Sequence, residues 1–222
     1  VTHGIGTSRR DFNTLMPAAM LVKDGFNVLL VDSRDTGEST CTDGRHSAGQ
    51  EESDDFARVA DWLVQEQGLS ASSIGMFGVS GGAIATSLTP AKTENISAFA
   101  MEGTIFDFNA AATREVEYQG FPGFLWQLAL VSAQLFHGVN LTETAVTDSI
   151  AAAGDRPMLI LHGEIDQRLD YQSSVDFVEY AESIGKSVQL ETFVGADHTE
   201  GMLTEPQRYA KALSDFFESS LR

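Results

Sequence analysis

Five short segments of the chain have the character of buried β-strands, and stretches of helical periodicity separate them. A strand that is buried on both faces of a parallel sheet carries apolar residues along most of its length. Parallel neighbours also need a crossover connection, which is usually a helix. The alternation therefore predicts an α/β fold with a doubly wound, mostly parallel sheet. The five segments are residues 27–32 (NVLLVD), 74–79 (IGMFGV), 96–101 (ISAFAM), 158–162 (MLILH) and 188–193 (VQLETF).

The predicted helices fit the same scheme. Apolar residues at helical spacing, with proline near a start or glycine just past an end, mark most of them. No internal repeat or low-complexity linker interrupts the 222 residues, so we expect a single domain over residues 1–222. The helices are expected near residues 16–24 and at 51–67, 81–88, 173–184 and 206–221.

The segment from about 104 to 156 breaks this alternation and is rich in aromatic residues. Its helices can pack on the edge of the sheet, or form a small cap whose inner face lines an apolar pocket above the strand ends. The two interpretations are compatible. We expect a small cap insertion at about 104–156.

The net charge of the chain limits the classes of partner that it is expected to bind. Lys and Arg number 14 against 32 Asp and Glu, which gives a formal net charge of −18. Such a surface repels nucleic-acid phosphates and anionic lipid, so neither is an expected partner. No apolar run reaches the ~18 residues of a membrane span. The single cysteine, Cys41, excludes an intramolecular disulfide and is expected to be an inert thiol.

Glycines surround one serine, Ser80, in the sequence GVSGG at 78–82. Two interpretations compete. In the first, Ser80 is only the cap of the following helix. In the second, the pentapeptide is a nucleophile elbow, in which a strained turn exposes the serine hydroxyl and the glycines let strand and helix approach closely. The pentapeptide alone leaves the choice open.

A serine nucleophile needs a base and a carboxylate that orients the base. In a parallel sheet both follow the carboxyl ends of later strands, in the chain order serine, acid, histidine. Asp166 lies four residues beyond the fourth predicted strand, and His198 lies in the loop between the fifth strand and the last helix. Glu102, just past the third strand, is the alternative acid. The positions predict Ser80, His198 and Asp166 as catalytic residues.

These motifs resemble the α/β-hydrolase superfamily, and especially its lysophospholipase/serine-aminopeptidase-like and carboxylesterase branches. The resemblance covers nearly the whole chain. It rests on HG at 3–4, DSRDTGES at 32–39, GVSGG at 78–82, RPMLILHGEID at 156–166 and GADH at 195–198.

The resemblance implies a role for each residue. Ser80 would be the nucleophile, His198 the general base and then the general acid, and Asp166 the carboxylate that orients the imidazole. The backbone N–H groups of Ile5 and Gly81 would form the oxyanion hole.

Other polar residues near the strand ends are expected to have structural roles. His3 and His162 each precede a glycine and are expected to make hydrogen bonds rather than act as bases. Asp32 and Arg34 are expected to form a buried ion pair that braces their loop. No spacing of His, Cys and Asp suggests a metal site, and Arg9 breaks the dinucleotide fingerprint in GIGTSR, so no metal or cofactor is expected.

The sequence therefore predicts a cofactor-independent serine hydrolase that cleaves small-molecule carboxylic esters through an acyl-enzyme on Ser80. A peptidase or amidase, or a thioesterase or acyltransferase, would use the same three residues. A non-catalytic binding protein on this fold is a further alternative. It would be expected to have lost the serine, the histidine or the acid, and none is lost here.

Only Val1 and Thr2 precede the HG motif, whereas a strand usually has about five or six residues. The resemblance implies further strands before this point, often an antiparallel hairpin. We therefore expect the natural protein to have an N-terminal segment that this sequence lacks. The sheet edge left without it would expose backbone groups and apolar surface, and we expect association with another chain, as in a homo-oligomer, at that edge.

Overall fold

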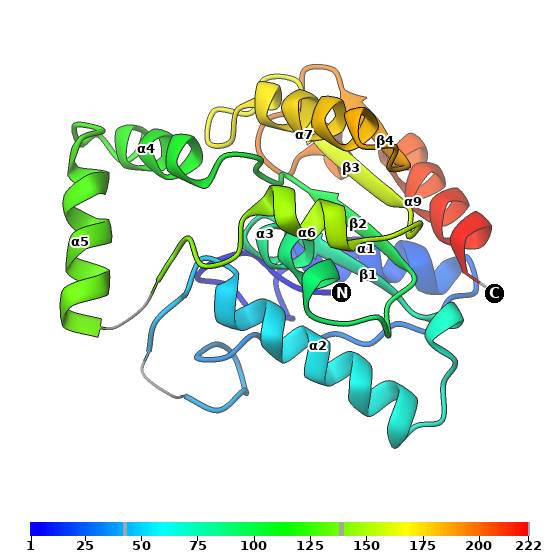
Figure 1. Ribbon diagram of the computed structural model, residues 1–222. Helices are drawn as coiled ribbons and strands as arrows, with labels where there is room; N and C mark the ends of the chain where they lie inside the picture. The colour runs from blue at the N-terminus through cyan, green and yellow to red at the C-terminus, as the bar shows by residue number, and fades with distance from the viewer. Residues whose placement is uncertain (42–43, 138–139, 222) are drawn as a thin grey trace.

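A sheet of four parallel strands, in the order β1-β2-β3-β4, forms the centre of the molecule (Figure 1). The computed structural model describes residues 1–41, 44–137 and 140–221. Each strand coincides with a predicted segment to within two residues, so the predicted parallel α/β sheet is confirmed. The strands are Gly75–Val79 (β1), Ala98–Glu102 (β2), Met158–Gly163 (β3) and Val188–Phe193 (β4).

Helices cover both faces of this sheet (Figure 1). Because successive side chains of a strand point to opposite faces, Met76 belongs to one buried core and Phe77 to the other. The core around Met76 is closed by α2 (Gln50–Gln65), α3 (Gly81–Leu88), α6 (Val146–Ala152) and α7 (Tyr171–Ser183). The core around Phe77 is closed by α1 (Phe12–Lys23), α8 (Gly201–Thr204) and α9 (Pro206–Ser220). Single turns of 3-10 helix lie at Ala71–Ser73 and Thr89–Ala91.

Helix α1 begins four residues earlier than predicted. The side chain of Asp11 accepts a hydrogen bond from the backbone N–H of Asn13 at 3.0 Å and caps the helix there. The helix therefore starts at Phe12, and Pro17 lies inside it rather than in its first turn.

The prediction of a regular buried strand at 27–32 is wrong. This segment is extended, but it makes a single parallel bridge, from Val31 to Thr2, and Thr2 in turn bridges to Gly78 of β1. Leu29 is 42% exposed, so the segment is not buried on both faces. The reason is that its pairing is short. Val1 bonds to the carbonyl of Leu29 and to the N–H of Val31, and Thr2 bridges on to β1, so two residues make the contact and do not supply a ladder of hydrogen bonds.

The expected cap segment contains three helices with different surroundings. Helix α6 returns to the sheet, where Ile150 is fully buried. Helices α4 (Phe108–Tyr118) and α5 (Leu125–His137) extend away from the sheet on one side of the molecule (Figure 1). Within the described residues, no helix has the length and apolar character needed to cross a membrane.

Candidate active site

Ser80 lies in the tight turn between β1 and α3. Its backbone has a φ of 52° and a ψ of −116°. A residue with a side chain rarely adopts such a conformation, which costs on the order of 1–3 kcal/mol. The N–H of Ser80 donates to the carbonyl of Glu102 at 2.8 Å and ties the turn to β2. Ser80 is by position the N-cap residue of α3, but its hydroxyl makes no capping hydrogen bond, so capping does not account for the serine side chain.

The glycines around Ser80 allow three backbone segments to meet. A side chain on Gly78 would overlap the carbonyl oxygen of Gly82 in the first turn of α3. A side chain on Gly82 would come within 2.6 Å of the carbonyl oxygen of His3. Strand β1, helix α3 and the N-terminal residues therefore pack backbone against backbone, and this close approach explains why glycines flank the serine.

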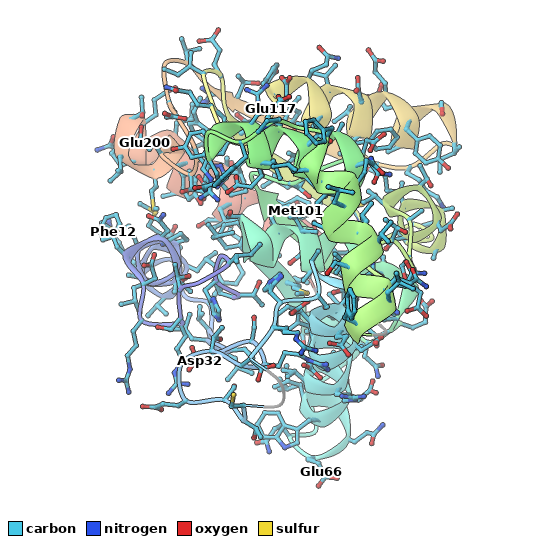
Figure 2. The ribbon with its side chains drawn as sticks, turned by 90° about the vertical axis from the view of Figure 1, so that its left-hand side faces the viewer. Phe12, Asp32, Glu66, Met101, Glu117 and Glu200 are labelled. Atoms are coloured by element: carbon cyan, nitrogen blue, oxygen red, sulfur yellow. The ribbon has the colours of Figure 1, made fainter. Side chains whose placement is uncertain are left out.

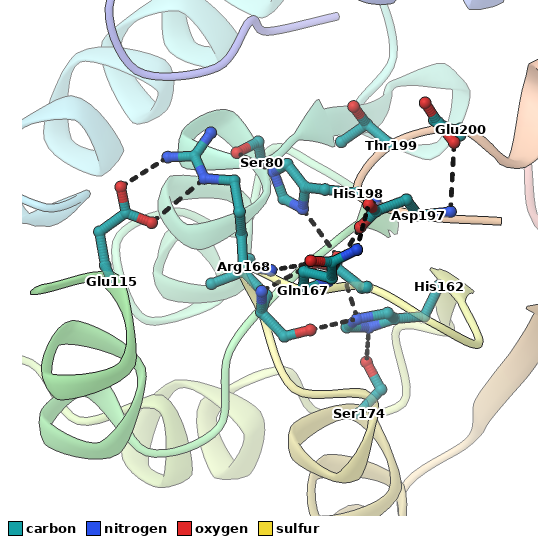
Figure 3. Close-up of polar contacts among 12 residues, drawn as sticks. Ser80, Glu115, His162, Gln167, Arg168, Ser174, Asp197, His198, Thr199 and Glu200 are labelled. Carbon is teal, nitrogen blue, oxygen red and sulfur yellow. Dashed lines mark hydrogen bonds and ion pairs between the residues drawn. The ribbon is translucent and has the colours of Figure 1, made fainter. Parts of the chain in front are cut away.

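A continuous chain of hydrogen bonds joins Ser80, His198 and Asp166, and Figure 3 shows Ser80 and His198 side by side. The hydroxyl oxygen of Ser80 lies 2.9 Å from Nε2 of His198, and Nδ1 of the same ring lies 2.7 Å from Oδ2 of Asp166. The three side chains come from the loops that follow β1, β4 and β3. The structure thus brings together the three residues that the sequence singles out. An ionised Asp166 keeps the imidazole proton on Nδ1, which leaves Nε2 free to accept the serine proton.

Asp166 is held as a carboxylate by its surroundings. Burial alone would raise its pKa, but hydrogen bonds from His162, from His198 and from the backbone N–H of Leu169 outweigh burial and lower the pKa below its ordinary value. The N–H groups of Arg168 and Leu169 both donate to Oδ1 at 2.8 Å. Asp166 is therefore ionised and fixed in orientation at neutral pH.

Two flanking residues, His162 and Asp197, support this arrangement (Figure 3). Nε2 of His162 lies 3.4 Å from Oδ2 of Asp166. Nδ1 of His162 lies 2.6 Å from the hydroxyl of Ser174 and Nε2 lies 3.1 Å from the carbonyl of Leu169, as expected of a structural histidine. The carboxylate of Asp197 accepts hydrogen bonds from the backbone N–H of His198 at 2.7 Å and from the backbone N–H of Gln167 at 2.9 Å. These contacts fasten the histidine loop to the acid loop.

The backbone N–H groups of Ile5 and Gly81 lie next to each other beside Ser80. A side-chain carbon on Gly81 would come within 2.8 Å of the Ile5 nitrogen, and one on Gly4 within 3.8 Å of the Ser80 hydroxyl oxygen. Among the described residues, neither N–H group has a hydrogen-bond acceptor. Gly81 is also the first residue of α3, so its N–H lies at the positive end of that helix. Two such donors beside a hydroxyl are suited to binding an oxyanion.

The structure does not bring Glu102, the alternative acid, to the histidine. Its side chain is buried and accepts a hydrogen bond from the hydroxyl of Tyr209 at 2.6 Å. Burial raises the pKa of Glu102 to about 7, although the Tyr209 hydrogen bond opposes the shift. The carboxylate that His198 contacts is Asp166.

We expect Glu102→Gln to remove a pH-dependent part of the stability. The folded protein holds the Glu102 proton up to about pH 7, whereas an unperturbed glutamate loses it near 4.5. Between these pH values the folded state binds more protons at Glu102 than the unfolded state does. The contribution of Glu102 to the free energy of unfolding therefore falls as pH rises, by about 3 kcal/mol in total. Urea unfolding at about pH 5 and about pH 8 measures the fall as a difference between wild type and Glu102→Gln.

The control for that experiment is Glu94→Gln, because the Glu94 side chain is 86% exposed. This variant should keep the pH dependence of the wild type. The assignment to Glu102 would be wrong if all three proteins lost the same stability between the two pH values.

The predicted ion pair between Asp32 and Arg34 is wrong. Asp32 instead pairs with Arg9, and Arg34 pairs with Asp55 of α2, with Nε 2.6 Å from the carboxylate. Asp32 also accepts the backbone N–H of Glu38 at 2.9 Å. The two side chains are anchored to different segments, one to the N-terminal loop and one to α2, and each pair braces its own part of the loop.

Helix α4 is tied to the acid loop by ion pairs that sequence analysis did not identify. Arg168 donates to both carboxylate oxygens of Glu115, at 2.8 and 3.1 Å (Figure 3). Arg114 pairs with Asp170 at 3.0 Å and also donates to the carbonyl of Asp166 at 3.2 Å. No motif or regular spacing connects these residues in the sequence. They place α4 beside the acid of the site.

Two cavities that share Ile105 adjoin α4. One, of about 470 Å³, lies between α4 and the start of α7 and is lined by Leu169, whose N–H donates to Asp166. The other, of about 250 Å³, is lined by Ile84, whose N–H bonds the Ser80 carbonyl at 3.0 Å one turn back along α3. The residues that line the two cavities do not include Ser80, Asp166 or His198, and each cavity is one backbone contact away from a residue of the site. In the described part of the chain, no group of three His, Cys, Asp or Glu residues could hold a metal ion.

The chain matches the model of one protein family and is similar in structure to several solved proteins. A model of the prolyl oligopeptidase family matches residues 12–222. The Pyrococcus furiosus esterase Pf2001 superposes with a TM-score of 0.79 at 20% identity, over 99% of this chain and 81% of that one. Est1E from Butyrivibrio proteoclasticus, with ferulic acid bound, gives 0.71 at 18% identity, over 99% and 87%.

The likeness extends to an acylaminoacyl peptidase from Pyrococcus horikoshii, with a TM-score of 0.62 at 18% identity. That match covers 78% of this chain and 28% of the peptidase. A sequence comparison with curated proteins gives no match. The structural relatives confirm the α/β-hydrolase fold that the sequence motifs indicate.

Proposed function

The chain belongs to the prolyl oligopeptidase family and is a serine hydrolase, and we propose that it cleaves carboxylic esters through an acyl-enzyme formed on Ser80. The observation that carries the proposal is the hydrogen-bond chain from Ser80 through His198 to Asp166. The serine end of this series of hydrogen bonds lies beside the backbone N–H groups of Ile5 and Gly81, which have no acceptor among the described residues.

In the acylation step, the Ser80 oxygen attacks the ester carbonyl carbon while its proton moves to Nε2 of His198. The N–H groups of Ile5 and Gly81 donate to the oxygen on which negative charge develops, and each such donor is typically worth about 10²–10³ in rate. The tetrahedral intermediate then expels the alkoxide, which takes the proton from His198. The products of this step are an acyl ester on Ser80 and the free alcohol.

In the deacylation step, His198 removes a proton from a water molecule, and the water oxygen attacks the acyl carbon. The same two N–H groups bind the second oxyanion. Ser80 then leaves with the proton from His198, and a carboxylic acid is released. Asp166 stays ionised throughout and stabilises the imidazolium that forms twice in the cycle.

The paired charges at the acid-loop end of α4 and the smaller cavity support an ester rather than a peptide as substrate. Glu115 and Arg114, the charged residues of α4 nearest the acid loop, are paired with Arg168 and Asp170. Binding the charged end of a peptide needs an unpaired group of opposite charge. The cavity beside Ile84 is lined mostly by aliphatic and aromatic side chains, which suit an uncharged acyl or alcohol group of modest size.

The peptidase alternative is favoured by two comparisons, the family itself and the acylaminoacyl peptidase among the relatives. It uses the same serine, histidine and aspartate. A peptidase differs by needing to protonate an amine leaving group and to bind a peptide backbone, so substrate preference separates the two functions.

Matched p-nitrophenyl esters and p-nitroanilides with the same acyl groups test the proposal. The account predicts a kcat/KM for the short-chain esters that exceeds the value for N-acylaminoacyl anilides by at least about 100-fold. Thioesters of the same acids extend the panel to the thioesterase alternative. Faster turnover of an N-acylaminoacyl anilide than of any ester would instead make the protein a peptidase.

A further inference from the structure

Helix α5 packs on α4 with one face. Trp126 meets Phe108 edge-on, with ring centroids 5.5 Å apart, and its indole N–H donates to Asn109 at 3.3 Å. Leu130 and Ala133 lie on the same side of α5 and are half-buried. Trp126, Leu130 and Ala133 follow one another at intervals of four and three residues, which is the spacing of one helix face. This inner face is therefore the one that packs on α4.

The opposite face of α5 is also apolar, and it is exposed. Phe124, which precedes the helix, and Leu128, Val131 and Leu135 within it are 57–72% exposed. We call these four residues the outer stripe. At about 100° per residue, the outer stripe points away from Trp126. Figure 1 shows α5 at the periphery of the molecule, beyond α4, and Figure 2, viewed from that side, shows the two helices facing the viewer.

The outer stripe lies in an uncharged part of a strongly acidic chain. Residues 118–142 contain no Asp, Glu, Lys or Arg, although these types make up 21% of the sequence and the net charge is −18. A basic or acidic partner therefore has no charge to recognise on α5. An anionic lipid surface would be repelled by the rest of the molecule.

The spacing of the outer stripe matches a second helix. Its residues follow one another at intervals of four, three and four, which is the spacing of the seam along which two helices pack knobs into holes. A second copy of this chain brings an identical stripe. The contact would also place two uncharged surfaces together, so that the two acidic molecules would not oppose like charges there.

The exposed area supports such a contact. The four residues of the outer stripe present roughly 450 Å² of apolar side chain. This estimate lies within the ~300–600 Å² of the largest apolar patch on a typical monomer, which is often functional. Two stripes together would bury roughly 900 Å², more than the ~800 Å² of most crystal-packing contacts and in the range of weak interfaces.

We propose that the outer stripe of α5 is a homodimer contact, in which the stripes of two copies pack against each other around a two-fold axis. Such an isologous contact closes after two copies. This contact differs from the association at the edge of the sheet that the sequence predicts.

Sedimentation velocity at micromolar concentrations tests the proposal. Wild type should sediment as a dimer, at twice the chain mass of 24.0 kDa. Leu128→Lys and Leu135→Lys each place a charge in the contact and should raise the dissociation constant at least about 100-fold. Gln134→Lys is the matched control, because Gln134 is exposed on the same helix but about a quarter-turn from the outer stripe. It should leave the dimer intact, and circular dichroism should show all variants folded.

Three results would overturn the proposal. The first is a wild type that stays monomeric over the concentration range. The second is a dimer that Leu128→Lys and Leu135→Lys leave unchanged. The third is a monomeric wild type that floats with phosphatidylcholine vesicles and loses this binding in Leu135→Lys, which would assign the outer stripe to a lipid surface.

Discussion

Replacing Ser80 with alanine is expected to lower kcat for p-nitrophenyl esters by about 10⁶-fold. The variant lacks the oxygen that forms the acyl-enzyme, and the remaining N–H donors of Ile5 and Gly81 can only polarise the carbonyl for attack by water. The ratio of the residual rate to the rate of the uncatalysed reaction would measure how much those two donors contribute to catalysis. Steady-state assays with purified Ser80→Ala provide the value.

Ser183→Ala is a suitable control, because Ser183 lies at the end of α7 and, among the residues that the structure describes, its hydroxyl donates only to the carbonyl of Tyr180, at 2.6 Å. It should keep the activity of the wild type. Thermal unfolding of Ser80→Ala should show an intact fold. A Ser80→Ala variant with near-wild-type turnover would refute the mechanism and favour a binding protein or a different nucleophile.

Changing Asp166 to asparagine is expected to lower kcat by about 10⁴-fold. An asparagine can donate its amide proton to Nδ1 of His198, which would move the imidazole proton to Nε2. In that tautomer the histidine cannot accept the proton of Ser80. Because the carboxylate of Asp166 is ionised well below neutral pH, the loss should be present throughout the neutral range.

Glu102→Gln is the informative comparison for Asp166→Asn, because Glu102 is the other carboxyl group next to the strand ends. It contacts Tyr209 rather than His198 in the structure, so this variant should lose less than about tenfold in kcat. The reverse ranking, with the larger loss in Glu102→Gln, would reassign the acid to Glu102.

The positions of Ser80, Asp166 and His198 could be predicted because they depend on local patterns and one rule of architecture. Each follows a short apolar segment that is long enough to form a strand. Parallel strands bring their carboxyl ends to one edge of the sheet, so the residues beyond them converge. These positions can be predicted without knowing how any particular side chain packs.

The features that sequence analysis missed depend on side-chain packing between distant segments. The pairing of Asp32 with Arg9, and of Arg34 with Asp55, is set by how the loop lies between the N-terminal residues and α2. The segment at 27–32 is apolar enough for a strand, but on the side of β1 it meets two residues, Val1 and Thr2. Apolarity alone does not reveal what lies beside a segment.

The two faces of α5 illustrate the same limit. Its sequence is apolar on both sides, and only the position of α4 decides that Trp126 is covered and Leu135 is exposed. The ion pair of Arg168 with Glu115 likewise exists because α4 lies over the acid loop. A contact of this kind leaves no spacing in the sequence from which it could be predicted.

The central claim is that Ser80 is the nucleophile, and covalent labelling tests it most directly. An alkyl fluorophosphonate should react with the wild type once per chain, and peptide mapping by mass spectrometry should find the adduct on Ser80. Ser80→Ala should not be labelled, and Asp166→Asn should be labelled much more slowly because its histidine no longer activates the serine. Labelling at another residue, or labelling of Ser80→Ala at the wild-type rate, would contradict the account.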